Sequence, residues 1–467
     1  MISISCGNDD PVSKENEKQT NQRVNEWIQA YMDVVYLWNT QMPAKTDKTL
    51  SPDKYFESLL YKAEDRFSYI AADYAELSDA LNGVQMEAGY AFKLFLKDQQ
   101  SQDVVGLIDY IKPHSPASST DLKRGDVFFT INGKQLTVNN YSALLSEMSA
   151  QHTLGVYRGG SLQSISLAVT RYEENPVLLD SIYDMGGKKI AYLIFNFFST
   201  DKGDNSYTYL KELNGIFGRY KQANVDELVL DLRYNGGGAV TVATALASMI
   251  SNRTSSDLFS IDQYNSIVDR EFKSGYGNDY NKTFFDDFLI VRNANGEIID
   301  QSTPVNKLSG LKRLYVLASD HTASASELVV NGLKPYMDVV LIGEKTYGKN
   351  VGMWFIYEED PQKQKTNRWG MLPIVVKTYN SKNQSDYSFG FLPDIVVDEY
   401  DTSSLLPLGN TRELLLEAAL ARIGVQQASA LRSAERVVYS QPFLASIDRT
   451  PVRKNMIIPL YPSKISR

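Results

Sequence analysis

Hydrophobic residues near the start of the chain recur every three or four positions, which is the spacing of one face of an α-helix. The pattern begins at Val24 and continues to Trp38. A second helix is expected after Ser51, a residue type that commonly caps helices, with Pro52 at the first helical position. A third helix is expected over residues 71–81. The pattern therefore predicts a small helical N-terminal region.

From residue 83 the pattern changes to short apolar runs of strand length. Two of them cover residues 90–96 (YAFKLFL) and 104–111 (VVGLIDYI). The pair Asn132-Gly133 is a strong signal for a two-residue hairpin turn, and a second hairpin is expected to turn at Gly159-Gly160. A helical stretch, NYSALLSEM, lies between the two hairpins. These elements predict a β-rich domain over residues 83–172.

Beyond residue 175, strand patterns and helix patterns alternate. The strand KKIAYLIFNFFS precedes the amphipathic stretch NSYTYLKELNGIFGRYKQA, and the strand DELVLDLRY runs into a glycine turn and another helix. Alternation of this kind predicts an α/β domain with parallel strands. Residues 252–309 are polar and aromatic, and we expect them to form an insertion, either a rim or a lid of this domain. Residues 401–467 are expected to form a C-terminal helix and an extended tail that packs back on the body.

The composition is that of a folded globular protein, with 43% hydrophobic and 22% charged residues among 467. A chain of this length exceeds one ordinary core, so roughly two to four domains are expected. The formal net charge of −8 argues against nucleic acid as a partner. No apolar run reaches membrane-spanning length. With one cysteine and three histidines, the chain lacks a cysteine or histidine cluster for a metal, and no metal or cofactor is expected.

The single cysteine, Cys6, follows small residues and precedes a polar, acidic stretch. This arrangement resembles the end of a bacterial lipoprotein signal, in which the cysteine becomes the acylated first residue, although the charged and apolar segments before it are incomplete. The resemblance implies a lipid anchor on Cys6 and a flexible tether over residues 1–22. It also implies a place in the bacterial cell envelope, in the periplasm or at the outer membrane. The alternative is a free thiol near a chain end.

The stretch SPASSTDLKRGDVFFTINGKQL, with the strands around it, resembles a PDZ domain in the order and spacing of its elements. GYAFKLFL stands where a PDZ domain has its carboxylate-binding loop and its peptide-accepting strand. The resemblance implies that this strand edge binds a peptide through Tyr90, Ala91, Phe92, Lys93 and Leu94. The alternative is a small β-domain without a ligand.

A serine-rich turn, HTASASE, joins the strand LYVLASD to the next helix. A serine at such a turn exposes its hydroxyl at the positive end of the helix dipole, where backbone N–H groups lack an intrahelical partner and suit a developing oxyanion. The glycine turn NGGG ends another buried strand and is expected at the same sheet edge, where α/β folds bind ligands. Ser324 and Ser326 are candidate nucleophiles. The candidate bases are His321, Lys345 and Lys349.

Four motifs in their order along the chain resemble the C-terminal processing (tail-specific) serine protease family. They are DLRYNGGG at residues 231–238, TASASE at 322–327, GEKTYGK at 343–349 and LPDIVV at 392–397. The likeness covers most of the chain, because in that family a helical N-terminal region and a PDZ domain precede the protease core. It implies a multidomain fold: a helical region over 23–82, a PDZ-like domain over 83–172, and an α/β core of the crotonase-like (ClpP-like) type over 173–400.

The resemblance also implies roles for individual residues. In the family the first serine of the Ala-Ser-Ala-Ser-Glu run is the nucleophile, and a lysine 25 residues later is the base, which selects Ser324 and Lys349. Such a dyad requires a lysine whose pKa is depressed by burial. The implied oxyanion donors are the N–H of Ala325 and a glycine N–H of the pair Gly236-Gly237, and the implied supporting residues are Glu327 and Thr346.

One position departs from the family pattern. Members commonly carry a glutamine four residues after the lysine, where this chain has Met353. Methionine has no hydrogen-bond donor with which to orient an amine. Either Thr346 replaces the glutamine or the dyad is less active.

The sequence thus predicts a serine endopeptidase that binds unstructured polypeptides by their free apolar C-termini and cleaves them without metal or nucleotide. The rival prediction is an envelope protein that holds peptides in the same groove and has lost catalysis. An esterase or amidase is disfavoured, because small esters need no domain that docks a polypeptide tail. The aromatic positions of the first helix, Trp27, Tyr31 and Trp38, are expected in the core or at the contact of a dimer.

Overall fold

A computed structural model describes most of the chain. The described residues are 11–44, 46–98, 101–158, 160–293, 297–358, 367–402, 405–425, 442–449, 452 and 454–459, with the backbone alone for 11–19. Cys6 with its predicted anchor, and Gly159 of the second predicted hairpin turn, lie outside the described residues. Among the described helices, none combines the length and the apolar character that crossing a membrane requires.

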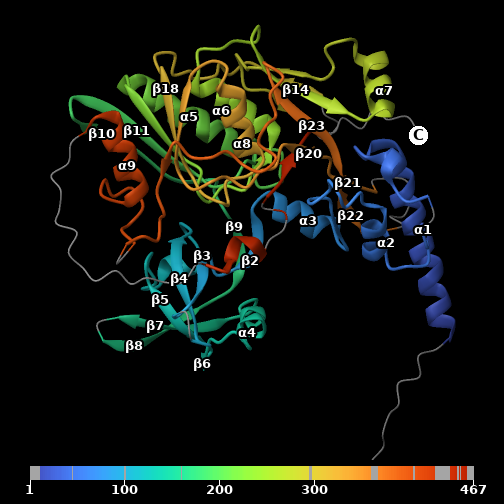
Figure 1. Cartoon of the computed structure of the whole chain (residues 1–467), viewed down its shortest axis with the longest axis horizontal. Helices are drawn as coiled ribbons and strands as arrows, with labels where there is room; N and C mark the ends of the chain where they lie inside the picture. The colour runs from blue at the N-terminus through green and yellow to red at the C-terminus, as the bar shows by residue number, and fades with distance from the viewer. Residues whose placement is uncertain are drawn as a thin grey trace, which may run out of the picture.

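Helices form the first part of the chain. They are α1 (Pro11–Val35), η1 (Asn39–Gln41), α2 (Pro52–Leu59) and α3 (Tyr74–Leu81). The predicted helices are confirmed, but the third begins at Tyr74 rather than at residue 71 because Asp73 caps it, accepting two N–H groups of its first turn. Ile28 and Met32 of α1 are buried in the same hydrophobic core as the α/β body. Figure 1 shows α1 and α2 alongside that body.

A β-rich group follows. Its elements are β2 (Val84–Glu87), β3 (Tyr90–Leu96), β4 (Val104–Ile111), η2 (Ala117–Ser119), β5 (Val127–Ile131), β6 (Lys134–Gln135), α4 (Tyr141–Glu147), β7 (His152–Arg158), β8 (Ser161–Leu167) and β9 (Thr170–Glu173). Strands β3, β4, β5, β7 and β8 pair in that order, with β6 on β5, and they enclose a separate apolar core. The first predicted hairpin is confirmed: it joins β5 to β6 through Asn132 and Gly133, both at positive φ. Figure 1 shows this group below the larger body.

The main sheet of the larger body is mostly parallel. Its strands, in spatial order, are β10 (Val177–Met185), β11 (Lys188–Phe195), β12 (Glu227–Asp231), β18 (Arg313–Ala318), β19 (Asp338–Gly343) and β24 (Ile395–Val396). Every neighbouring pair except β10–β11 is parallel, which confirms the predicted α/β arrangement. One face packs on α5 (Thr208–Ala223), α6 (Val240–Ile250) and α8 (Ala325–Leu333), and the other on α9 (Leu414–Ile423).

A second sheet lies against these helices. Its order is β13 (Gly238–Ala239), β26 (Met456–Ile457), β20 (Val351–Met353), β23 (Ile374–Asn380), β14 (Leu258–Tyr264) and β15 (Lys282–Phe284). Smaller elements are α7 (Ser266–Tyr276), the pair β16 (Val291–Arg292) and β17 (Ile298–Asp300), and β21 (Ile356–Tyr357) with β22 (Gly370–Leu372), which pairs with β1 (Tyr69–Ala71). Strand β14 falls within the predicted insertion 252–309 and pairs with β23. That part of the segment is therefore built into a sheet instead of standing at a rim.

The last described residues return to the body, as the sequence predicted. They form β25 (Leu444–Ala445), η3 (Ser446–Arg449) and β26. Strand β25 pairs with β3 of the β-rich group, and β26 lies between β13 and β20. The end of the chain thus joins two groups of elements that are far apart in the sequence.

A buried arginine connects the main sheet to its surroundings. The Arg233 guanidinium is fully buried and is paired with Asp231, with Glu399 at 2.9 Å and with Glu413 at 2.7 Å. Glu399 also pairs at 2.7 Å with Arg124 from the β-rich group. Because buried charges are stable only when they are paired, this network fixes the end of β12 and the placement of the β-rich group beside it.

We expect Arg233→Leu to lower the free energy of unfolding by about 3–5 kcal/mol, because it leaves buried carboxylates without their partner. Urea denaturation followed by circular dichroism measures the change. Arg219→Leu is the matched control, since the Arg219 side chain is half-exposed where it pairs with Asp180, and it should cost less than about 1 kcal/mol. Equal losses in the two variants would contradict the role assigned to the buried network.

Candidate active site

Ser324 occupies the turn between β18 and α8. It is the N-cap of α8, with φ 63° and ψ −112°, a backbone conformation that is costly for a residue with a Cβ atom. Its side chain is fully buried, and its Oγ has no hydrogen-bond partner among the described residues. Buried hydroxyls are normally paired, so the strained backbone and the unpaired Oγ together mark Ser324 as a candidate functional residue.

The other nucleophile and base candidates are placed differently. The Ser326 hydroxyl donates a hydrogen bond to the Asn235 carbonyl at 3.0 Å. Lys345 is exposed. His321 is buried, burial lowers its pKa to about 4, and neither ring nitrogen has a hydrogen-bond partner in the described part of the chain. The Ser324 Oγ has no partner among the described residues, so it is hydrogen-bonded neither to the His321 ring nor to the Lys349 amine.

A buried carboxylate links Ser324 to the lysine turn. One Glu327 oxygen accepts the Ser324 N–H at 2.8 Å and the Lys349 N–H at 2.9 Å. The other accepts the Gly348 N–H at 2.8 Å and the Thr346 hydroxyl at 2.6 Å. Burial raises the pKa of Glu327, and these four donors act in the opposite direction by favouring the ionised form. The carboxylate therefore fixes the position of the start of α8 relative to the turn that follows β19.

Lys349 is fully buried next to this carboxylate. Its Nζ donates to the Lys454 carbonyl at 2.8 Å and to Asn455 Oδ1 at 3.1 Å, and it lies 4.9 Å from the centre of the Phe67 ring. Burial lowers the pKa of Lys349 to about 7, and the negative charges of Asp65 and Glu327 offset only part of that effect. A large fraction of this amine is therefore neutral near pH 7, which a general base requires.

Two residues near the lysine bear on the departure from the family pattern. Met353 Sδ lies 3.4 Å from Lys349 Nζ, where sulfur is a weak acceptor. Thr346 contacts Glu327 and donates to it, so its hydroxyl supports the carboxylate clamp. The amine is therefore oriented by oxygen atoms of the C-terminal segment and by Met353, and Thr346 acts on it only through Glu327.

The glycine turn lies beside Ser324. The Gly237 N–H donates to Asn235 Oδ1 at 2.9 Å, and the next N–H, that of Gly238, donates to the Asn455 carbonyl. A methyl group on Gly237 would collide with both Asn455 O and Ser324 Cβ, so only glycine fits here. The donor that faces a carbonyl in this structure is therefore Gly238. Gly238 is not among the donors predicted from the sequence, because its hydrogen-bond partner comes from the distant C-terminal end of the described chain.

The predicted peptide strand, β3, presents backbone at its edge. The Tyr90, Phe92 and Leu94 side chains are buried in the core of the β-rich group. Ala91 packs in a small cluster between the two groups, and the buried Lys93 ammonium lies 3.7 Å from Asp320. The five predicted residues are thus together on one strand. Their side chains are buried on the two opposite faces of the strand, and the edge carries hydrogen-bonding backbone groups instead.

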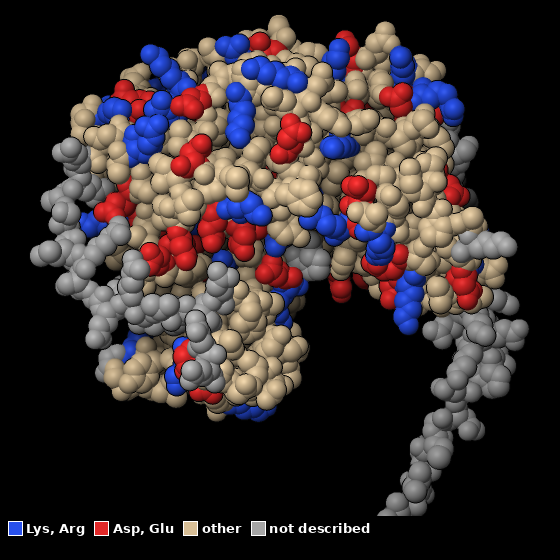
Figure 2. Space-filling view, in the orientation of Figure 1, with Lys and Arg blue, Asp and Glu red and all other residues tan. Residues whose placement is uncertain are grey.

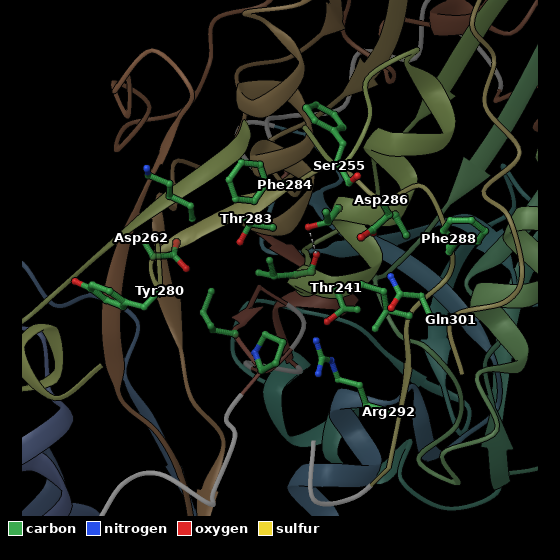
Figure 3. A pocket seen from close by; sticks show the side chains of 18 of the residues that line it. Thr241, Ser255, Asp262, Tyr280, Thr283, Phe284, Asp286, Phe288, Arg292 and Gln301 are labelled. Atoms are coloured by element: carbon green, nitrogen blue, oxygen red, sulfur yellow. Dashed lines mark hydrogen bonds between the residues drawn. The ribbon is translucent and has the colours of Figure 1, made fainter. Parts of the chain in front are cut away.

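A cavity of about 640 Å³ adjoins the far end of the β13–β26 ladder. It is lined by Thr241 at the start of α6, by Asp262 and Asp286, and by Ile458 and Pro459 of the C-terminal segment. Figure 3 shows Thr241, Asp262 and Asp286 around it, with Tyr280 and Arg292 at its sides. Neither Ser324 nor Lys349 lines this cavity.

The remaining features are candidate metal ligands and the charges on one face of the molecule. Among the described residues, no three His, Cys, Asp or Glu side chains are grouped to hold a metal ion. Figure 2 shows Lys and Arg interspersed with Asp and Glu over the face in view.

Comparisons with known proteins place the chain in a family. The model of "Peptidase family S41" matches residues 189–397, and that of "Peptidase S41 N-terminal domain" matches residues 23–69. The C-terminal processing peptidase (chloroplastic) of Tetradesmus obliquus is 26% identical over 303 residues, 61% of this chain and 54% of that protein. The carboxy-terminal processing protease CtpA of Bacillus subtilis (strain 168) is 25% identical over 311 residues, 65% of this chain and 56% of that protein.

A solved structure is similar over most of the chain. The crystal structure of a "Putative S41 protease" from Bacteroides fragilis NCTC 9343 is 26% identical with a TM-score of 0.68, covering 85% of this chain and 97% of that one. The chain spans about half the length of the first curated relatives it matches. It belongs to peptidase family S41, with the α/β core of that family.

We expect Lys349→Met to gain stability over the natural chain as the pH falls. The folded pKa is lowered from 10.5 to about 7, so between these values the unfolded chain binds a proton that the folded chain does not. The difference in free energy of unfolding should therefore grow from about pH 10 to about pH 7 and be constant below. Urea denaturation across this range measures it, with exposed Lys345→Met as control. A difference independent of pH would contradict the depressed pKa.

Proposed function

We propose that this chain is a serine endopeptidase of the C-terminal processing type, with Ser324 as the nucleophile and Lys349 as the general base. One observation carries the proposal: a strained, buried serine with an unpaired Oγ is joined through Glu327 to a buried lysine with a pKa of about 7. A strained backbone, a buried unpaired hydroxyl and a buried lysine each lower the stability of the fold. A nucleophilic serine needs an available hydroxyl, and its base needs a depressed pKa, so these features together indicate a catalytic pair.

The proposed reaction uses the neutral amine of Lys349. Ser324 Oγ attacks the carbonyl carbon of a peptide bond, and its proton passes to Lys349. The carbonyl oxygen becomes an oxyanion that accepts hydrogen bonds from the N–H groups of Gly238 and Ala325. The C–N bond then breaks as the new amine takes the proton from Lys349. Water, deprotonated by Lys349, hydrolyses the ester, which releases a carboxylate and restores the serine.

Gly238 takes a place that the sequence analysis gave to Gly236 or Gly237. The Gly237 N–H is already donated to Asn235 Oδ1, whereas the Gly238 N–H faces a peptide carbonyl next to Ser324. Ala325 is the first residue of α8, where backbone N–H groups have no acceptor within the helix. We therefore propose Gly238 and Ala325 as the donors, with the Gly236 N–H as the alternative from the glycine turn.

Substrate docking and location complete the proposal. The β-rich group is proposed to act as a PDZ domain, with the edge of β3 accepting polypeptides that end in a free apolar C-terminus. The substrates would be unstructured chains, because a cleft lined by short strands accepts an extended backbone. A bacterial envelope location with a lipid anchor on Cys6 is proposed from the sequence alone, and no nucleic acid, metal or cofactor takes part.

A second candidate function is a peptide-binding envelope protein without catalysis. It is favoured by Met353, whose sulfur lies beside Lys349 where the family commonly has glutamine. A thioether holds an amine in place less firmly than an amide oxygen does. The binder would use the same β3 edge and would release its peptides intact.

Ser324→Ala should abolish cleavage of an unfolded protein, with a loss of at least about a thousandfold in kcat/KM, because no other hydroxyl occupies the attacking position. Fragments are measured by mass spectrometry. Ser326→Ala is the matched control, since that hydroxyl is engaged with the Asn235 carbonyl, and it should retain most of the activity. Full activity in Ser324→Ala would remove this serine as the nucleophile. Loss in both variants would point to misfolding, which circular dichroism detects.

The pH profile of kcat/KM should follow the titration of Lys349. The neutral amine is the active form and its pKa is about 7, so kcat/KM should rise about tenfold per pH unit below that value and level off above it. Measurement from about pH 5 to about pH 9 covers both limbs. A rise centred near pH 10 would mean an ordinary exposed lysine, and a flat profile would mean that a lysine base is not involved.

A further inference from the structure

The C-terminal segment, here meaning the described residues among 442–459, contacts the β-rich group first. Strand β25 pairs antiparallel with β3, with Leu444 opposite Leu94. The Phe443 N–H donates to the Leu94 carbonyl at 3.1 Å, and the Phe92 N–H donates to Ser446 Oγ at 2.9 Å. The strand edge proposed for peptides is therefore already paired, and its partner is this chain itself.

Helix α4 forms the other wall of this contact. The Phe443 ring meets the Tyr141 ring edge to face, with centroids 5.4 Å apart. Arg449 donates a hydrogen bond to the Leu145 carbonyl at 2.9 Å. The segment therefore lies between β3 and α4, where strand addition to a sheet edge and side-chain contact to a helix act together.

The same segment then enters the cleft beside the dyad. Strand β26 lies parallel to β13 on one side, with Met456 opposite Gly238, and beside β20 on the other. The Gly238 N–H donates to the Asn455 carbonyl, and the Ile458 N–H donates to the Met353 carbonyl at 2.9 Å. An extended polypeptide therefore fills the space between the glycine turn and the strand that follows Lys349.

Asn455 stands at the catalytic atoms. Its carbonyl oxygen and Ser324 Cβ both border Gly237 so closely that a methyl group there would strike both. The Lys349 ammonium has three N–H groups, and three acceptors surround it: Lys454 O, Asn455 Oδ1 and Met353 Sδ. Two of these acceptors belong to the segment, so the amine is hydrogen-bonded to the segment and not to Ser324.

Contacts between the two docking regions hold the segment in place. Lys454 pairs with Asp448 at 2.6 Å and lies over the Tyr347 ring, 4.4 Å from its centre. Met456 is fully buried in the main core. Because the segment is covalently attached, it binds at a high effective concentration and outcompetes a free polypeptide of similar affinity.

We propose that the C-terminal segment is a built-in inhibitor, which occupies the β3–α4 groove and the Ser324 cleft at the same time and must leave both before a polypeptide is cut. The effect on cleavage rests on the proposed function. The binding of the segment in the groove and beside Ser324 does not depend on that function. The proposal predicts that a free peptide with the sequence of residues 442–459 binds the chain only when the attached segment is removed or displaced.

The first test compares the full chain with a chain that ends at residue 441, both carrying Ser324→Ala. A fluorescently labelled peptide of residues 442–459 is titrated against each, and fluorescence anisotropy reports binding. We expect the shortened chain to bind at least about tenfold more tightly than the full chain. Equal binding to both chains, or no binding to a shortened chain that circular dichroism shows to be folded, would overturn the proposal.

A second variant keeps the full chain, because β26 is part of a sheet and its removal has a folding cost. Met456→Lys places a charge at a fully buried position and should expel the segment, and Met456→Leu is the conservative control. We expect Met456→Lys to bind the peptide like the shortened chain and, with Ser324 present, to raise cleavage by about tenfold or more. Met456→Leu should match the natural chain in both measurements.

The two readouts separate the two proposals. Peptide binding as expected, without cleavage in any form, would leave the segment as the occupant and reject the endopeptidase. Cleavage by the full chain at the rate of Met456→Lys would reject the inhibitor and leave the endopeptidase. Rapid cleavage of the natural chain before residue 456, which would release residues 456–467, would also reject the inhibitor. The segment would then be a substrate.

Discussion

The buried carboxylate of Glu327 is the interaction on which the site depends. It sits in the first turn of α8 and accepts the backbone N–H groups of Ser324 and Lys349, which are brought together from different parts of the chain. This single carboxylate therefore fixes both the strained turn at Ser324 and the turn that carries Lys349. Without it, the positive φ of Ser324 would have no local compensation, and the amine of Lys349 would lose its fixed distance from the serine.

The rest of the fold brings this carboxylate and its donors to the same edge. Parallel strands β18 and β19 end side by side, so the turns that follow them meet. Strand β12 ends next to β18 and carries the glycine turn to the same place. The paired charges around Arg233 lie just before that turn and connect it to Arg124 of the β-rich group. The β-rich group is therefore joined, through Glu399, to the strand that bears the glycine turn.

The sequence predicted what is local or recurrent. Alternating strand and helix patterns predicted the parallel sheet, and the Asn132-Gly133 pair predicted its hairpin, because each depends on neighbouring residues alone. The resemblance to the C-terminal processing family implied Ser324, Lys349 and Glu327, which the structure joins through the Glu327 carboxylate. The sequence did not predict Gly238 as the facing donor or the Asn455 contact, because these depend on a segment more than a hundred residues away. The expected rim insertion over 252–309 was wrong for β14, where the polar residues Ser260 and Asp262 are buried inside a sheet.

The central claim is that Ser324 is made nucleophilic by Lys349, and labelling with a small serine-reactive fluorophosphonate tests it most directly. The labelled protein is digested, and mass spectrometry locates the adduct in the natural chain, in Lys349→Met and in the chain ending at residue 441. The account predicts an adduct on Ser324, faster in the shortened chain and absent from Lys349→Met. An adduct on another residue, or equal labelling of Ser324 with and without Lys349, would contradict it.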